Sequence, residues 1–113
     1  MSAITTHVLD TSRGRPAAGV LVVLERRLGD GHQEICRGKT DADGRLRTLL
    51  PQGAPVDLGV YRLTFHTAEY FASLGGEGFY PEVTIAFEIK DSAQHYHVPL
   101  LLNPYGYSTY RGS

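Results

Sequence analysis

Residues 61–65 read Tyr-Arg-Leu-Thr-Phe, and this short stretch decides the fold class. Successive side chains of a β-strand point to opposite faces of a sheet, so Tyr61, Leu63 and Phe65 would share one face while the polar residues between them share the other. This period of two predicts a strand with one face in a hydrophobic core and the other in water.

The same alternation recurs on both sides of this stretch, and turn signals separate the repeats. Two of these turns are Gly29-Asp30-Gly31 and Asp41-Ala42-Asp43-Gly44. Residues 67–74 change to a spacing of four before Gly75-Gly76, which predicts one short helix. The other predicted strand segments are residues 4–9, 20–24, 33–40, 45–50, 82–89 and 94–102, with a last strand in the tail from residue 105 onward.

These segments predict an all-β protein, an antiparallel β-sandwich of about seven to eight strands with one short helix. The 113 residues are near the usual size of one domain, and no linker or repeat interrupts them. Residues 1–113 are therefore expected to form a single domain. Binding modules of the immunoglobulin or fibronectin type have a similar strand count, so the fold class alone does not decide the function.

The charge of the chain argues against nucleic-acid and membrane-surface roles. Eleven Lys and Arg residues against twelve Asp and Glu residues give a net charge of −1, without a block of like charge. The first residues contain no basic segment leading into an apolar run, and no apolar stretch reaches the length of a membrane span. We therefore expect a cytoplasmic protein with no nucleic-acid partner and no membrane partner.

The single cysteine, Cys36, cannot form a disulfide within the chain. No histidine lies beside it in the sequence to activate its thiol. Cys36 is therefore expected to be a strand residue and not a nucleophile.

Candidate chemistry begins with His95 and His97, which flank Tyr96. Residues two apart share a sheet face, so both imidazoles would point the same way. Three interpretations remain open at this point. The pair could bind zinc together with His7, could be two unconnected surface histidines, or could form a metal-free acid–base site, because imidazole has a reference pKa of about 6.5.

The surroundings of His7 and Arg45 give weaker signals. Two threonines precede His7, and their hydroxyls could fix its tautomer. Arg45 directly follows the Asp43-Gly44 turn, where a side chain leaves a tight bend near a sheet end, but Arg47 would share its face and is the alternative arginine. No nucleophile elbow, phosphate-binding glycine loop or paired carboxylate motif occurs, which excludes most familiar enzyme classes.

Tyr110-Arg111-Gly112-Ser113 ends the sequence with a dense polar set. Within four residues it offers a phenol, a guanidinium, a hydroxyl and a terminal carboxylate, which suit a small polar ligand. Aromatic residues before it continue to alternate, so the tail is expected to be ordered and not frayed. Two interpretations stay open, an edge strand that only finishes the sheet and a wall of a binding site.

Four separated segments match one family. With them the chain resembles the 5-hydroxyisourate hydrolases, the transthyretin-related proteins of purine catabolism, over essentially its whole length. The terminal Tyr-Arg-Gly-Ser is the family's most specific signature, and the chain shows no departure at the motif positions. The four segments are Ile4-Thr5-Thr6-His7-Val8-Leu9-Asp10, Thr40-Asp41-Ala42-Asp43-Gly44-Arg45, residues 95–102 (His-Tyr-His-Val-Pro-Leu-Leu-Leu) and residues 104–113 (Pro-Tyr-Gly-Tyr-Ser-Thr-Tyr-Arg-Gly-Ser).

The resemblance implies a transthyretin-like sandwich assembled as a homotetramer, a dimer of dimers with active sites between the dimers. It also implies hydrolysis of 5-hydroxyisourate to 2-oxo-4-hydroxy-4-carboxy-5-ureidoimidazoline in urate degradation, with no metal and no other cofactor. The role of His95 and the identity of the general base stay open. The family's catalytic positions match His7, Arg45, His97 and Ser113, and its substrate-binding positions add Tyr110, Arg111 and Gly112.

Two other classes of protein are the alternatives. A transthyretin-like carrier would use the same fold to bind an aromatic, hormone-type ligand without catalysis. A structural or carbohydrate-binding sandwich would present exposed aromatic platforms. The polar set of His7, Arg45, His97 and the terminal tetrapeptide favours the hydrolase, because a hormone channel has no use for these groups.

Overall fold

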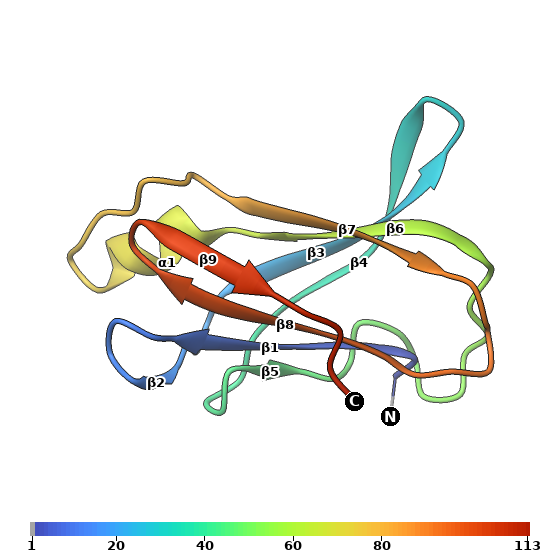
Figure 1. Cartoon of the computed structure of the whole chain (residues 1–113), viewed down its shortest axis with the longest axis horizontal. Helices are drawn as coiled ribbons and strands as arrows, with labels where there is room; N and C mark the ends of the chain where they lie inside the picture. The colour runs from blue at the N-terminus through green and yellow to red at the C-terminus, as the bar shows by residue number, and fades with distance from the viewer. Residues whose placement is uncertain (1) are drawn as a thin grey trace.

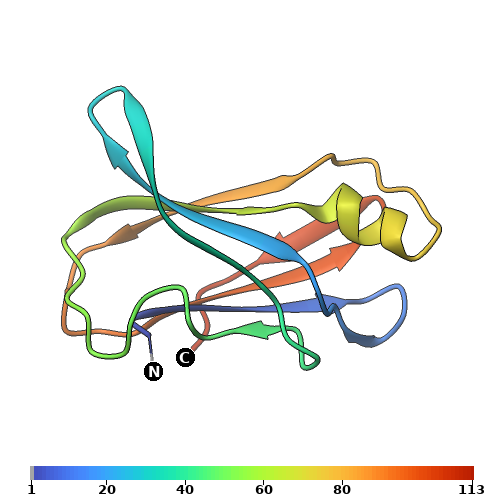
Figure 2. The same cartoon turned by 180° about the vertical axis from the view of Figure 1, so that it is seen from behind.

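Two β-sheets pack face to face in the computed structural model, which describes residues 2–113, and one short helix lies at the end of the sandwich (Figures 1 and 2). We call them sheet A and sheet B. Sheet A has the strand order β2-β1-β8-β9, and β5 pairs with β1 at the same edge as β2. Its strands are β1 (Ile4–Asp10), β2 (Arg15–Pro16), β5 (Arg45–Leu46), β8 (Tyr96–Asn103) and β9 (Gly106–Thr109).

Sheet B has the strand order β4-β3-β6-β7 and is antiparallel throughout. Its strands are β3 (Leu21–Leu28), β4 (Gly31–Lys39), β6 (Gly59–Phe65) and β7 (Val83–Ile89). The helix α1 (Thr67–Ser73) follows β6. The strand predicted at residues 61–65 and the helix predicted at residues 67–74 are thus confirmed. The strand predicted at residues 45–50 is wrong beyond Leu46, because β5 ends there after two residues. Among the described residues β2 is also a two-residue strand, and the seven longer strands agree with the predicted seven to eight.

One strand pair differs from the antiparallel expectation, because β1 and β8 run parallel. The loop that follows β7 crosses from sheet B to sheet A and brings the chain back beside the start of β1. There the Tyr96 N–H donates to the Ala3 carbonyl at 2.8 Å. Strand β8 therefore begins where β1 begins, and both strands run in the same direction.

The core between the sheets follows the alternation of the strands. Leu63 and Phe65 of β6 belong to the same core cluster as Ile4 and Val8 of β1, and all four side chains are fully buried. Burying each such side chain contributes roughly 1.5–3 kcal/mol to the free energy of unfolding. The face of β1 that carries Thr5, His7 and Leu9 points away from this core, as the alternation predicts.

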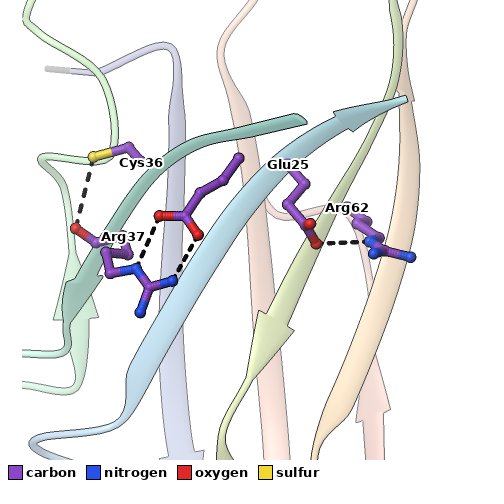
Figure 3. A network of polar contacts seen from close by, with 5 residues as sticks. Glu25, Cys36, Arg37 and Arg62 are labelled. Carbon is purple, nitrogen blue, oxygen red and sulfur yellow. Dashed lines mark hydrogen bonds and ion pairs between the residues drawn. The ribbon is translucent and has the colours of Figure 1, made fainter. Parts of the chain in front are cut away.

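The outer face of sheet B is a surface of ion pairs (Figure 3). Arg62 and Glu25 lie 2.8 Å apart, and Arg37 and Glu34 lie 2.6 Å apart. Exposed pairs of this kind contribute little to stability. Cys36 lies in β4 with its thiol 3.6 Å from the Arg37 carbonyl, so it is a strand residue as expected. No helix within residues 2–113 has the length and apolar character needed to cross a membrane.

Candidate active site

The pairing of β1 with β5 places His7 beside Arg45. The two residues are partners in the antiparallel register, so their side chains share the outer face of sheet A. The turn before β5 depends on Gly44, whose φ of +75° is a conformation that residues with a Cβ rarely adopt. The Gly44 carbonyl accepts a hydrogen bond from the Val8 N–H at 2.7 Å, which fixes the turn against β1.

The pairing of β1 with β8 places Thr5 between two histidines. Thr5 is the register partner of His97. Its Oγ1 lies 2.8 Å from Nδ1 of His97 and 2.8 Å from Nε2 of His95. The prediction that both imidazoles share one face is therefore confirmed, and the interpretation of two unconnected surface histidines is wrong.

The idea that the threonine hydroxyls fix the tautomer of His7 is also wrong. Thr5 contacts the histidines of β8, and Thr6 donates to the Val98 carbonyl at 2.6 Å on the core face. The cause is geometric. Thr6 points to the opposite face of the sheet from His7. Thr5 shares a face with His7, but its side chain lies nearer to the neighbouring strand than to His7.

The chain beyond β9 crosses back over β8 and covers His97. The Gly112 N–H donates to the His97 carbonyl at 2.9 Å, in an isolated antiparallel bridge. The Arg111 guanidinium donates to the Gln94 side chain at 2.8 Å and stacks 4.5 Å from the centre of the Tyr96 ring. The tail is thus ordered, and it is more than an edge strand, because β9 ends at Thr109.

These elements surround a hollow of about 300 Å³ on the outer face of sheet A. It combines cationic, imidazole and hydroxyl groups, and no Asp or Glu side chain is among its lining residues. Its lining residues are Thr5, Thr6, Arg45, Arg47, His95, His97 and Ser113.

The structure brings together three of the four residues predicted to be catalytic, Arg45, His97 and Ser113, and the fourth, His7, lies beside Arg45. The tail residues Tyr110 and Arg111 line a second hollow, against β7, and do not line the first one. Their role in substrate binding stays a prediction.

Three lining residues, Thr5, Thr6 and Arg47, were not assigned to the site by the sequence. Arg47 was only the alternative to Arg45, whereas both arginines line the hollow. The hydroxyl of Thr5 was expected to contact His7, whereas it contacts His95 and His97. The available signal was the period of two, which puts Thr5 on the same face as His7 and Arg47 on the same face as Arg45.

The surroundings of His7 and His97 favour the neutral imidazole. Burial lowers the pKa of His7 from its usual value of 6.5, and the charge of Arg45 lowers it further, against an opposing effect of the Asp43 backbone. The pKa of His97 is lowered by burial, then by Arg45 and by the neighbouring histidines. Both imidazoles are therefore neutral at pH 7 and can accept a proton.

This arrangement suits the hydrolysis of a carbonyl compound by attack of water on the carbonyl carbon. A neutral imidazole can take a proton from water, and a guanidinium can bind the oxygen on which negative charge develops. Within residues 2–113, no three His, Cys, Asp or Glu side chains converge in a way that could hold a metal ion. Independence from metal stays a prediction.

Comparison with known proteins gives one consistent result. Residues 4–112 match the model of the HIUase/transthyretin family. A protein of Rhizobium meliloti named 5-hydroxyisourate hydrolase 2 is 49% identical over 114 residues, which cover 97% of this chain and 95% of that protein. The 5-hydroxyisourate hydrolase of Klebsiella pneumoniae superposes with a TM-score of 0.87 at 42% identity, covering all of both chains.

The fold is also shared with a transthyretin solved in complex with thyroxine. Sea bream transthyretin in complex with thyroxine superposes with a TM-score of 0.90. The two sequences are 29% identical, and the match covers 97% of this chain and 94% of that one. The sandwich is therefore common to proteins of different function, and only the side chains of the site can distinguish them.

Proposed function

The chain belongs to the HIUase/transthyretin family, and from this premise we propose that it hydrolyses 5-hydroxyisourate. One observation carries the proposal. Arg45, His97 and Ser113 line a single hollow in which the imidazole is neutral and which no Asp or Glu side chain lines. Relatives that match nearly the whole chain carry the name of this activity.

The proposed reaction opens a cyclic amide. A neutral histidine, His97 or His7, takes a proton from water while the water oxygen attacks the carbonyl carbon. The Arg45 guanidinium binds the carbonyl oxygen as it becomes negative. The C–N bond then breaks, and the leaving nitrogen takes up a proton from the protonated histidine. The new carboxyl group releases the second proton of the water to solvent, which leaves a carboxylate in the product, 2-oxo-4-hydroxy-4-carboxy-5-ureidoimidazoline. Ser113 orients the water or the substrate.

We further propose that residues 1–113 act as a single domain within a homotetramer, a dimer of dimers with the active sites between dimers. The hollow lies on an open sheet face, which a second copy of the chain would enclose. Such closure would give Tyr110, Arg111 and Gly112 a place in the wall of the site. A role in purine catabolism and a cytoplasmic location belong to the same proposal.

The alternative is a transthyretin-like carrier of an aromatic ligand. The thyroxine-bound transthyretin shows that this fold can enclose such a molecule. We favour hydrolysis because the hollow presents two guanidiniums and two imidazoles. Charged and titratable groups of this kind serve proton transfer and anion binding, whereas an aromatic ligand needs apolar walls.

The test is the decay of the ultraviolet absorbance of freshly generated 5-hydroxyisourate. The protein should accelerate the decay, and His97→Asn or His7→Asn should lower kcat/KM about 100 to 10,000-fold, as expected for loss of a positioned base. His32→Asn is the matched control, because His32 is exposed at the far end of β4. No acceleration at micromolar protein would favour the carrier, and a loss of less than about threefold in both variants would contradict the assignment of the bases.

A further inference from the structure

Thr5 holds one hydroxyl proton for two imidazole nitrogens. Its side chain is only 3% exposed, and its Oγ1 lies 2.8 Å from His95 and 2.8 Å from His97. A hydroxyl can donate one hydrogen bond and accept two. When both histidines are neutral, at least one of the two facing nitrogens must therefore carry a proton, because otherwise one contact would join two acceptors.

The two contacts can be satisfied in two ordered ways. In the first, Nδ1–H of His97 donates to Thr5, and the Thr5 hydroxyl donates to Nε2 of His95. His97 then has an unprotonated Nε2, which is the ring nitrogen left to meet water or substrate. In the second, Nε2–H of His95 donates to Thr5, the hydroxyl donates to Nδ1 of His97, and Nε2 of His97 carries a proton.

His95 also borders a different part of the surface. It lines the hollow that contains His97, and it lines another hollow of about 310 Å³ together with Ser2, Ala3, Gly53 and Gln94. His95 therefore connects the candidate active site with a separate opening to solvent. A proton on His95 can exchange with water without passing through the substrate.

We propose that Thr5 is a positioning residue that couples the protonation of His97 to that of His95, so that a proton taken up in the active site is relayed to the outer histidine. The proposal rests on the proposed hydrolysis. When Nε2 of His97 takes a proton from water, its Nδ1 proton passes to Thr5 as the hydroxyl proton passes to Nε2 of His95. His97 is then neutral with a proton on Nε2, the positive charge is on His95, and the reverse transfer returns the proton.

The charges around His97 favour this displacement. The charge on Arg45 lies close enough to lower the pKa of His97, and His7 and His95 act in the same direction. An imidazolium held at His97 would face cationic neighbours, whereas His95 has a second opening to water. The titratable and charged groups near the pair are His7 from β1, Arg45 and Arg47 from β5 and the residues after it, and Arg111 and Ser113 from the tail.

The test compares Thr5→Val with Thr5→Ser. Removing the hydroxyl should lower kcat about 10 to 100-fold with KM nearly unchanged, because Thr5 holds the base and not the substrate, and serine should restore the rate to within about threefold of the parent. Thr64→Val is the matched control, since Thr64 is a buried threonine on the outer face of sheet B whose hydroxyl lies 3.2 Å from that of Thr84.

Nitrogen-15 NMR of the histidines provides a measurement that does not depend on turnover. The parent protein at pH 7 should carry the neutral His97 proton on Nδ1, and Thr5→Val should move it toward Nε2. The proposal is overturned if the tautomer and kcat stay unchanged in Thr5→Val, or if serine is as impaired as valine.

His95→Phe tests the other end of the relay should the valine variant fail to fold. This variant removes the proton acceptor beyond Thr5, so it should lower kcat and change the tautomer of His97. An unchanged His97 tautomer would overturn the relay. If the parent did not hydrolyse 5-hydroxyisourate, the proposed function would fail, while the tautomers would still decide whether Thr5 couples the two histidines.

Discussion

Gly112 packs against the His97 ring, which fills the space that a side chain at position 112 would need. A Cβ at this position would lie 2.5 Å from Cδ2 of His97 and 3.3 Å from Cγ of Pro99. The backbone of the tail therefore packs directly on the imidazole, while the Thr5 hydroxyl holds the opposite part of the ring through Nδ1. Tail and strand together fix the orientation of the candidate base.

Gly112→Ala should therefore reduce activity through the position of His97. Either the ring or the tail must shift, and a displacement of about 1 Å in a catalytic group can cost about 100-fold in rate. The measurement is kcat/KM for 5-hydroxyisourate, with circular dichroism as the check on folding. Gly31→Ala is the control, because a Cβ there meets no atom within 4 Å. Equal activity of both variants would contradict this role.

The lowered pKa values of His7 and His97 predict the acid limb of the pH profile. A neutral base loses activity as the pH falls through its pKa, so the limb should lie below the usual value of 6.5. Arg45→Gln removes a positive charge and should raise both histidine pKa values, which NMR titration of the imidazoles would measure. Arg27→Gln, at the exposed end of β3, is the control. Unchanged values in Arg45→Gln would contradict the electrostatic cause.

The helix α1 is fastened to β1 through a buried carboxylate. Asp10 is fully buried at the end of β1 and accepts the Tyr70 hydroxyl at 2.8 Å and the Ser12 hydroxyl at 2.6 Å. Burial raises the pKa of Asp10, but the hydrogen bonds from Ser12, Tyr70 and the Arg13 backbone outweigh it, so that the net pKa is lowered. The charged carboxylate thus ties the helix to the strand that carries Thr5 and His7.

Tyr70→Phe should destabilise the fold in a pH-dependent way. Loss of a hydrogen bond to a buried charged group costs about 1.5–3 kcal/mol. Because the folded pKa of Asp10 lies below its unfolded value, its contribution is present above about pH 4 and is lost as the pH falls through the folded pKa. Urea unfolding should show the full difference from the parent at neutral pH and a smaller one in acid. Tyr107→Phe is the control, and a difference that is constant with pH would contradict the account.

Within residues 2–113, an edge strand of each sheet has no partner on the side of the tail. These are β7 in sheet B and β9 in sheet A, and the Tyr107 side chain on β9 is 42% exposed. The hollow between Tyr110, Arg111 and β7 lies between these edges. Unpaired edges are natural sites for association with another chain, so they are candidate contacts for the proposed tetramer.

A charge at this edge should weaken the assembly. Tyr107→Glu would place a carboxylate where another strand would pair, which disfavours edge-to-edge contact. We expect sedimentation to show a tetramer for the parent and smaller species for the variant, with lower activity on dilution. Leu28→Glu, at the exposed tip of the β3–β4 hairpin, is the matched control. A fully active monomeric parent would contradict the proposal that the site needs a second copy.

The local pattern of the chain determined the elements and the faces of the strands. Alternation at residues 61–65 and the turn at Gly44 act between near neighbours, so they could be predicted without knowledge of the fold. The resemblance of four segments, including the tail, pointed to His7, Arg45 and His97.

The tertiary structure alone decided how these residues meet. The parallel pairing of β1 with β8 joins residues about ninety positions apart and puts Thr5 between His95 and His97. The return of the tail across β8 likewise places Gly112 on His97 and Ser113 at the hollow. Alternation specifies which face a side chain occupies but not which strand lies beside it, because pairing between distant strands depends on the packing of the whole sandwich.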